Sequence, residues 1–387
     1  MTSQVYFGSP RQARLDARET LPAKLDLILD RLHLRDRVKD ETVAIKMHTG
    51  NNIGYSTVHP LFVRKIVAAV KEGGGQPFVT DLNWDVRACE ERGYTTETLG
   101  CPVYPSAGPD EKYYYVHTRS YKNIQEWKLA GMIQDASFLI NLAHVKGHPS
   151  CSMGGAFKNL ALGCMAGETR SAMHDAMHYD PYWFADLCPD PVIRQRIVEV
   201  CPRNGIVQDK HNSNELHMHF EECNQCGRCL QIAPPGSLKI DAINFLTFQE
   251  ACAISTAITF STFAPEKVTH LALATHMTPV CDCFGFTSMP ILPDAGLFGS
   301  DDIVAIDQAV LDVTAQTPLI EENLPTAMEV HTRQGHPLQW LHGPLKDPYK
   351  ITEYGEKLGL GSRDYELVDV LPVVKVERSA ATYIPAM

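Results

Sequence analysis

The chain of 387 residues is 44% hydrophobic and 21% charged, a globular composition with enough length for one large core or two smaller ones. Its formal net charge of -11 gives no basic surface that would attract nucleic acid or an anionic membrane. No apolar run approaches the roughly 20 residues that span a bilayer, and the first residues lack the apolar core of a signal peptide. We therefore expect a cytoplasmic protein that binds neither nucleic acid nor membrane.

The first part of the chain predicts a β–α–β unit. After a helix expected over residues 21–34, ETVAIKMH alternates like a strand, PLFVRKIVAAVKEGGG has the pattern of a helix ended by glycines, and PFVTD follows as a second strand. Lys46 and His48 then lie at the end of the first strand, and Asp81 at the end of the second. This succession favours an α/β fold with a mostly parallel sheet flanked by helices.

Two later segments, ASFLINLAHVKGH and THLALATH, are typical of buried strands, and each runs into a histidine. In open parallel sheets the carboxyl ends of the strands border the ligand crevice. We therefore expect His48, Asp81, His144 and His276 to converge there. The alternative is that each histidine is a structural residue with its hydrogen bonds satisfied.

The stretch AHVKGHPSCSMGGAFKNLALGC carries the other candidate catalytic groups, Lys146, His148 and Lys158. Gly154 and Gly155 permit close backbone approach, so a carboxylate or phosphate is expected to reach amides at the following helix start. Lys158 enters an apolar helix, where desolvation would lower its pKa and make it a base, a nucleophile or an attachment point for a cofactor. The alternative is a lysine that extends along the helix face to solvent. This combination suits a small anionic substrate.

Two further pairs of metal-ligating side chains occur. Cys281 and Cys283 follow the strand that ends near His276, so we expect them at the rim of the crevice, where they would ligate a second metal or relay electrons. Two ordinary buried thiols are the alternative. In HDAMH, His174 and His178 stand one helical turn apart, a metal-binding spacing for which no third ligand is identifiable.

The sequence CNQCGRCLQIAPP places Cys223, Cys226 and Cys229 at C-x2-C-x2-C spacing, with Ala233 where a bacterial ferredoxin has a fourth cysteine before proline. In a two-cluster ferredoxin each cluster takes its fourth cysteine from the other run. Upstream, EVCPRNGIV supplies Cys201 followed by proline, as at the end of such a run.

The losses in the two runs are complementary. Stepping back from Cys201 by the ferredoxin spacing gives Pro191, Arg194 and Ile197, none of which ligates iron. Four cysteines therefore make one complete ligand set for a single [4Fe-4S] cluster: Cys201, Cys223, Cys226 and Cys229. A tetrahedral zinc site is the alternative, since paired C-x2-C spacings also hold zinc.

Several of these motifs together resemble the uncharacterised iron-sulfur-centre proteins that contain domain of unknown function 362. The resemblance covers about residues 43–312 and is carried by HVKGH, GGAFKNLALGC, the ferredoxin-like insert, PVCDCFGF and LPDAGLFGSDDIVAIDQAVLD. Members of that family usually carry a complete two-run insert, from which this sequence departs. More distantly, His148, Gly154, Gly155 and Lys158 are similar to the nickel-dependent lactate racemases, which implies a cofactor anchored on Lys158.

These patterns predict an α/β domain formed by residues 1–185 and 242–387, interrupted by a ferredoxin-like α+β insert over 186–241, with the C-terminal tail wrapping the domain. The leading hypothesis is an iron-sulfur oxidoreductase that works with a redox partner protein. The first alternative is an electron carrier or redox-coupled binding module. The second is a racemase-like or epimerase-like enzyme with a cofactor on Lys158 and a structural cluster. The candidate cofactor-binding residues are Gly154, Gly155, Lys158, Cys281 and Cys283.

Overall fold

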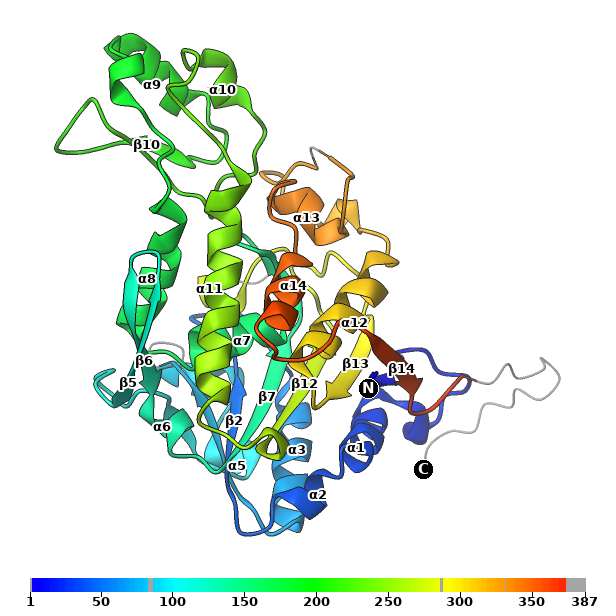
Figure 1. Cartoon of the computed structure of the whole chain (residues 1–387). Coiled ribbons are helices and arrows are strands. Elements are labelled where there is room, and N and C mark those ends of the chain that lie inside the picture. Colours follow the sequence, from blue (N-terminus) through cyan, green and yellow to red (C-terminus); the bar gives the residue numbers. More distant parts are fainter. Residues whose placement is uncertain (1, 83–85, 286–287, 331, 374–387) are drawn as a thin grey trace.

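An eight-stranded sheet forms the centre of the molecule (Figure 1), in a computed structural model that describes residues 2–82, 86–285, 288–330 and 332–373. The strand order is β14-β1-β13-β12-β7-β2-β3-β4. Neighbouring strands are parallel, except that β13 runs antiparallel to both β1 and β12. The predicted mostly parallel α/β fold is therefore confirmed. The strands are β1 Ser3–Gly8, β2 Thr42–Met47, β3 Gln76–Asp81, β4 Val103–Pro105, β7 Phe138–His144, β12 Val268–Ala274, β13 Gly296–Ser300 and β14 Tyr365–Asp369.

Three two-stranded antiparallel ribbons lie outside this sheet. They pair β5 Tyr114–Tyr121 with β6 Ile124–Ala130, β8 Lys146–His148 with β9 Ser152–Gly154, and β10 Ile206–Gln208 with β11 Leu216–Met218. The β8–β9 ribbon follows β7 directly and carries two of the predicted catalytic side chains.

Helices cover both faces of the sheet. The α-helices are α1 Leu21–Arg31, α2 Leu34–Arg37, α3 Pro60–Glu72, α5 Thr96–Leu99, α6 Gly131–Gln134, α7 Ala156–Gly163, α8 Gly167–Asp175, α9 Pro191–Glu199, α10 Arg228–Ile232, α11 Ala242–Phe260, α12 Ile303–Ala315, α13 Pro337–His342 and α14 Lys350–Lys357. Short 3-10 turns are η1 Ala17–Glu19, η2 Cys89–Arg92, η3 Ala176–His178, η4 Ala185–Leu187, η5 Pro265–Lys267, η6 Asp282–Phe284 and η7 Glu321–Asn323. None of the described helices is both long enough and apolar enough to cross a membrane.

Side chains of the central strands point alternately to the two faces of the sheet, and each face has its own hydrophobic core. Val43, Ile45 and Met47 of β2 pack with α1 and α3 on one face. Ala44 belongs to the other core, with the apolar side chains of α7, α11 and α12. Because successive side chains on a strand point to opposite faces, Lys46 and His48 continue the series of Ala44 toward α7. The sequence alternation therefore places both side chains on the α7 face.

The local sequence explains the helix boundaries. The helix predicted over residues 21–34 is divided in the structure, since α1 ends at Arg31 and His33 adopts a left-handed conformation with φ of 52° before α2 begins. The predicted helix at Pro60 is confirmed as α3, which has proline in its first turn and ends before Gly73.

The segment 186–241 contains α9, the β10–β11 ribbon and α10, and it projects from the end of the molecule at which α11 begins (Figure 1). Strands of the eight-stranded sheet come from the chain on both sides of this segment. Phe220 packs edge-on against Phe245 of α11 with ring centroids 5.3 Å apart, so the segment shares a core with the main body. The C-terminal segment adds β14 beside β1 at the sheet edge.

Candidate functional site

A cavity of about 370 Å³ lies at the carboxyl ends of β2 and β3, beside α7 and the β8–β9 ribbon. This volume falls in the range that small-molecule sites occupy in proteins. Basic, acidic and sulfur-bearing side chains converge on it. Its lining includes Lys46, His48, Asp81, Lys146, His148, Lys158, Asn159, Arg170, His174, Glu221, Glu222 and Cys283.

The ends of β2 and β3 contribute three buried polar side chains that contact one another. Asp81 Oδ1 lies 3.0 Å from Lys46 Nζ, and Asp81 Oδ2 lies 2.9 Å from His48 Nδ1. Burial alone would raise the pKa of Asp81, but Lys46 and His48 lower it well below its usual range. Asp81 therefore remains a carboxylate that neutralises Lys46 and orients His48.

Helix α7 is fixed to the strands by Asn159. Its amide nitrogen donates to Asn141 Oδ1 at 2.7 Å, and its Oδ1 accepts from Lys46 Nζ at 2.8 Å. Gly163 lies one turn further along, where an added Cβ would stand 1.8 Å from Lys46 Cε. A glycine is therefore needed for Lys46 to reach Asp81 beneath this helix.

The Cys281-Asp282-Cys283 loop meets the cavity from the β12 side. Asp282 Oδ2 lies 2.8 Å from His144 Nδ1 and 3.1 Å from Lys146 Nζ. Burial would raise the pKa of Asp282, but these two groups lower it, so it is ionised. Cys283 lines the cavity, and Cys281 is buried beside α7. The loop is therefore held in place by its middle residue.

Lys158 extends from α7 into the cavity and donates to Cys281 Sγ at 2.9 Å. The expected fall in its pKa is wrong. Burial favours that fall, but the sulfurs of Cys281 and Cys283 reverse it and raise the pKa of Lys158 above its usual value. Burial also opposes ionisation of Cys281, whereas its hydrogen bond with Cys283 and the charge of Lys158 lower its pKa well below normal. The two groups form an ammonium–thiolate pair.

Two neutral histidines complete the lining. Burial and the charge of Lys158 lower the pKa of His148 to about 4, and burial lowers that of His174 to about 3. Both rings pack against Phe248, His148 in a stacked geometry with a centroid distance of 5.9 Å. His148 Nδ1 accepts from the backbone N–H of Ser150 at 3.2 Å. Near neutral pH these imidazoles offer lone pairs and N–H groups without charge.

Two of the strand-end histidines do not line this cavity. On β7, the side chain of His144 falls on the same side as those of Phe138, Ile140 and Leu142, which pack on the face away from α7. The Nε2 of His144 lies 3.0 Å from the carbonyl oxygen of Thr275. His276 lies beyond the end of β12 and its ring packs edge-on against Tyr55. The expected convergence of all four strand ends is therefore wrong for these two residues.

Gly154 and Gly155 are also absent from the cavity lining. The first amides of α7, those of Ala156 and Phe157, donate to the two carboxylate oxygens of Asp307 at 2.7 and 2.9 Å. An added Cβ at Gly155 would lie 2.5 Å from Asp307 Oδ1, so this glycine makes room for the carboxylate. The expected anion site at this helix start is therefore wrong, because a side chain of the protein already fills it.

The two histidines of HDAMH have separate surroundings. His174 faces the cavity, whereas His178 Nε2 bonds to the carbonyl of Met218 at 2.8 Å and its ring packs on Phe220. The second histidine thus joins the 186–241 segment to the main body.

Cys201, Cys223, Cys226 and Cys229 all line one small hollow in the 186–241 segment. The backbone N–H of Gly205 donates to Cys201 Sγ at 3.1 Å. Burial raises the pKa of Cys223, and it raises the pKa of Cys229 to about 11. The first and last of these cysteines, Cys201 and Cys229, are 28 residues apart in the chain, and they line the same hollow.

The segment that contains α13 connects this hollow with the cavity. The N–H of Leu345 donates to Gln225 Oε1 at 2.6 Å, and Lys346 Nζ donates to the carbonyl of Glu221 at 3.2 Å. On the other side, His342 Nε2 lies 2.8 Å from the carbonyl of Pro279, two residues before Cys281. We call residues 336–346 the bridging segment.

Sequence reasoning did not assign a role to Lys46, Asn159, Arg170 or Asp282. The alternation of Lys46 with His48 was a usable signal, since residues two apart on a strand share a face. The contacts of Arg170 and of the glutamates at 221 and 222 arise only from packing between distant segments.

The fold and the cavity define an α/β protein with a buried site of lysine, histidine and cysteine side chains beside a four-cysteine hollow. The chain belongs to the family described as "Domain of unknown function (DUF362)", whose model matches residues 43–312. Among solved structures it is similar to the lactate racemase apoprotein of Thermoanaerobacterium thermosaccharolyticum, with 9% identity and a TM-score of 0.33. That similarity covers 70% of this chain and 50% of the other, so the chain spans half the length of that structure. No curated protein matches.

Proposed function

We propose that this protein is an iron-sulfur oxidoreductase in which one [4Fe-4S] cluster, held by Cys201, Cys223, Cys226 and Cys229, exchanges electrons with a small anionic substrate in the cavity. The observation that carries the proposal is the adjacency of the two places. Glu222 lines the cavity, and the next residue, Cys223, lines the four-cysteine hollow. Consecutive Cα atoms are about 3.8 Å apart, so the path between them is short.

The four cysteines fit a cluster better than a single metal ion. At a zinc–sulfur distance of about 2.3 Å, tetrahedral ligand sulfurs lie about 3.8 Å apart. Among the described residues, one group of three ligand atoms lies within 4.8 Å of one another, and it consists of His48, Cys281 and Cys283. No three of the hollow's four sulfurs lie that close together, so they are spaced too widely for a single zinc ion. The N–H···S contact at Cys201 is of the kind that tunes iron-sulfur clusters.

The positions that a second cluster would need are filled by protein. Arg194 donates from its guanidinium to the carbonyls of Cys188 and Pro189 at 2.7 and 2.8 Å. Ile197 is fully buried in the core, and Pro191 begins α9. Their arrangement supports a domain with a single cluster.

When bound, a [4Fe-4S] cluster supplies or accepts one electron at a time. The residues of the cavity would bind and orient the substrate and move its proton. Lys46, Lys146, Lys158 and Arg170 line the cavity and favour an anionic group, with Asp81, Glu221 and Glu222 as the opposing acids. We assign proton exchange to His148, which presents a neutral imidazole.

A redox partner protein is expected to dock on the 186–241 segment. This segment projects from the main body (Figure 1), and its four cysteines are only partly buried. Electron transfer to a partner requires a cluster close to the surface.

The decisive experiment is anaerobic purification followed by iron and acid-labile sulfide analysis with visible and EPR spectra. We expect about four of each per chain, the content of one cube, and we expect Cys201→Ser to lose them while Cys252→Ala, a buried cysteine of α11, keeps them. Twice that content, or zinc without sulfide, would contradict the proposal.

The two alternative functions lead to different results. An electron carrier would show the cluster spectrum but bind no small anion in the cavity. A racemase-like enzyme would show a mass increment on the peptide that contains Lys158.

A further inference from the structure

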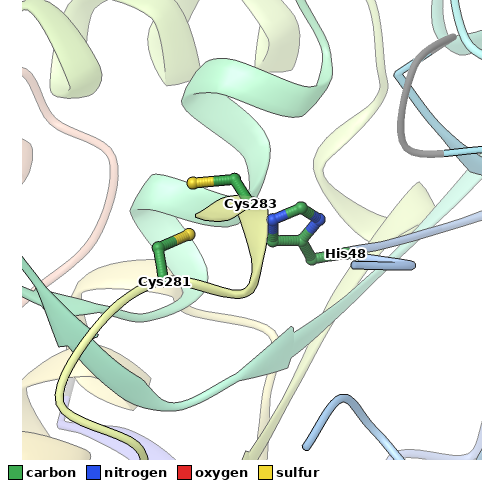
Figure 2. Close-up of side chains that lie close together, drawn as sticks. All are labelled: His48, Cys281 and Cys283. Atoms are coloured by element: carbon green, nitrogen blue, oxygen red, sulfur yellow. The ribbon is translucent and has the colours of Figure 1, made fainter. Parts of the chain in front are cut away.

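We propose that His48, Cys281 and Cys283 bind one thiophilic divalent metal ion of the zinc class, at a centre separate from the four-cysteine hollow. One ligand atom from each residue lies within 4.8 Å of the other two (Figure 2). They come from the end of β2 and from the loop after β12, which are 233 residues apart between His48 and Cys281. This centre does not depend on the proposed cluster.

The loop brings both sulfurs close to His48. Asp282, the residue between the two cysteines, is anchored by His144 Nδ1 at 2.8 Å and Lys146 Nζ at 3.1 Å. With the middle side chain held in this way, the sulfurs of Cys281 and Cys283 lie side by side and the ring of His48 lies next to them (Figure 2). His144, which sequence reasoning assigned to catalysis, thus acts as an anchor of the metal-binding loop.

The orientation of His48 is that of a metal ligand. Its Nδ1 lies 2.9 Å from Asp81 Oδ2, and that carboxylate also pairs with Lys46 and accepts from the N–H of Thr49 at 2.8 Å. A carboxylate paired with lysine accepts hydrogen bonds, so Nδ1 carries the proton and the lone pair resides on Nε2, the ring nitrogen that faces the sulfurs in Figure 2. Carboxylate–histidine–metal arrangements of this kind fix the tautomer and strengthen the ligand.

The donor set favours a particular class of ion. Two thiolates and one imidazole suit borderline-soft ions such as Zn²⁺, whereas Mg²⁺ and Ca²⁺ prefer oxygen ligands. Three protein ligands leave a fourth tetrahedral position open, as in catalytic zinc sites. His48 and Cys283 both line the cavity, so that open position faces it. A carboxylate or carbonyl oxygen of a small ligand would complete the coordination there.

Lys158 belongs to the surroundings of this centre. Its Nζ donates to Cys281 Sγ at 2.9 Å, and it lines the same cavity. A hydrogen bond to a coordinated thiolate lowers the electron density that the sulfur gives to the metal. Lys158 is therefore a positioning residue for Cys281 in this proposal.

The test measures metal on the full-length protein. The anaerobically purified chain is dialysed against Zn²⁺ or Co²⁺, and bound metal is counted beside iron. We expect one Zn²⁺ per chain in addition to any cluster iron, and a thiolate-to-cobalt charge-transfer band with Co²⁺. Cys281→Ser and Cys283→Ser should each weaken Zn²⁺ binding more than about 100-fold. Each removes a ligand, whereas changing a residue that only supports a ligand costs about 10- to 100-fold. Asp81→Asn should weaken binding about 10- to 100-fold.

Two matched controls separate this centre from other thiols. Cys101→Ser changes a buried cysteine outside the cavity and should retain the ion. Cys201→Ser removes a proposed cluster ligand and should also retain it, so loss of the cluster and loss of this metal are distinguishable. The proposal is overturned if Cys281→Ser and Cys283→Ser bind as much Zn²⁺ as the parent chain, or if the parent binds none.

A measurement on the unmodified protein guards against variants that fail to fold. Added Zn²⁺ should slow alkylation of Cys283, located by peptide mass spectrometry, at least tenfold, while the cysteines other than Cys281 and Cys283 keep their rates. Equal rates with and without Zn²⁺ would overturn the proposal. So would a Cys281–Cys283 disulfide in the anaerobically isolated chain that persists in the presence of Zn²⁺.

Discussion

The ammonium nitrogen of Lys158 lies 2.9 Å from the sulfur of Cys281, although 123 residues separate them in the chain. Each group would be costly to bury as an isolated charge, and together they stabilise one another's ionised form. The pair links the first turns of α7 to the loop after β12.

The first prediction follows from this pair. In metal-free protein, Lys158→Met should raise the pKa of the Cys281 thiol by about 1–3 units, because an opposite charge within a few ångströms is removed. The pH dependence of the alkylation rate of Cys281 measures the shift. Lys158→Arg keeps the charge and should leave the pKa near its original value; a similar rise in both variants would mean that charge is not the cause.

The second prediction concerns Asp282. Its replacement by Asn leaves His144 and Lys146 buried without their carboxylate, and breaking a buried ion pair typically costs about 3–5 kcal/mol. Urea unfolding of the variant measures the loss. The control is Glu321→Gln, which removes an ion pair to Arg333 whose side chains are 47% and 58% exposed and should cost at most about 1 kcal/mol. Equal costs would refute the structural importance of Asp282.

The third prediction is a pH dependence of stability from His270. Burial lowers the pKa of this histidine from 6.5 to about 3 in the folded protein, so it stays neutral there. Below pH 6.5 the unfolded chain takes up a proton that the folded chain excludes, so stability is full above pH 6.5 and falls as the solution is acidified. One such group removes about 2 kcal/mol of unfolding free energy between pH 7 and pH 5.

The comparison that isolates His270 is His270→Gln, whose amide oxygen can replace the acceptor for the Asn141 amide, 3.2 Å from His270 Nδ1. The variant should lose less stability than the parent over that pH interval in chemical denaturation. An unchanged acid dependence would show that other groups produce it.

The fourth prediction concerns removal of the proposed cluster. Because metal binding and folding are coupled, stripping iron should make residues 186–241 sensitive to proteases while the eight-stranded sheet remains protected. The small β10–β11 ribbon and the two short helices of the segment have little core of their own. Limited proteolysis with mass spectrometry locates the cuts. Cleavage that begins in the main sheet would argue against a local role for the metal.

The centre of the sheet could be predicted from the sequence, because β2, β3, β7, β12 and α3 have strong local patterns. The alternation in ETVAIKMH predicted β2 and also the position of Lys46 and His48 at its end. The antiparallel insertion of β13 between β1 and β12 was not predictable in this way, since strand order depends on contacts between distant segments.

The candidate site was only partly predictable for a related reason. Position at a strand end placed His48 and Asp81 correctly but failed for His144, whose side chain alternates to the other face. The effect of burial on Lys158 was predicted without knowledge of its sulfur partner, so the direction of its pKa shift was wrong. Paired glycines suggested a ligand, whereas the approaching group is the protein's own Asp307.

The bridging segment, residues 336–346, has a consequence for how the chain is made. All twelve cysteines precede residue 284, so each leaves the ribosome before the segment that joins the cysteine hollow to the cavity. At about 5–20 residues per second, the interval between synthesis of Cys283 and of Lys346 is roughly 3–13 seconds. During that time the thiols of the nascent chain meet cellular ions and oxidants before their final surroundings exist, so under the proposed cluster assignment both iron delivery and thiol protection fall on the timescale of translation.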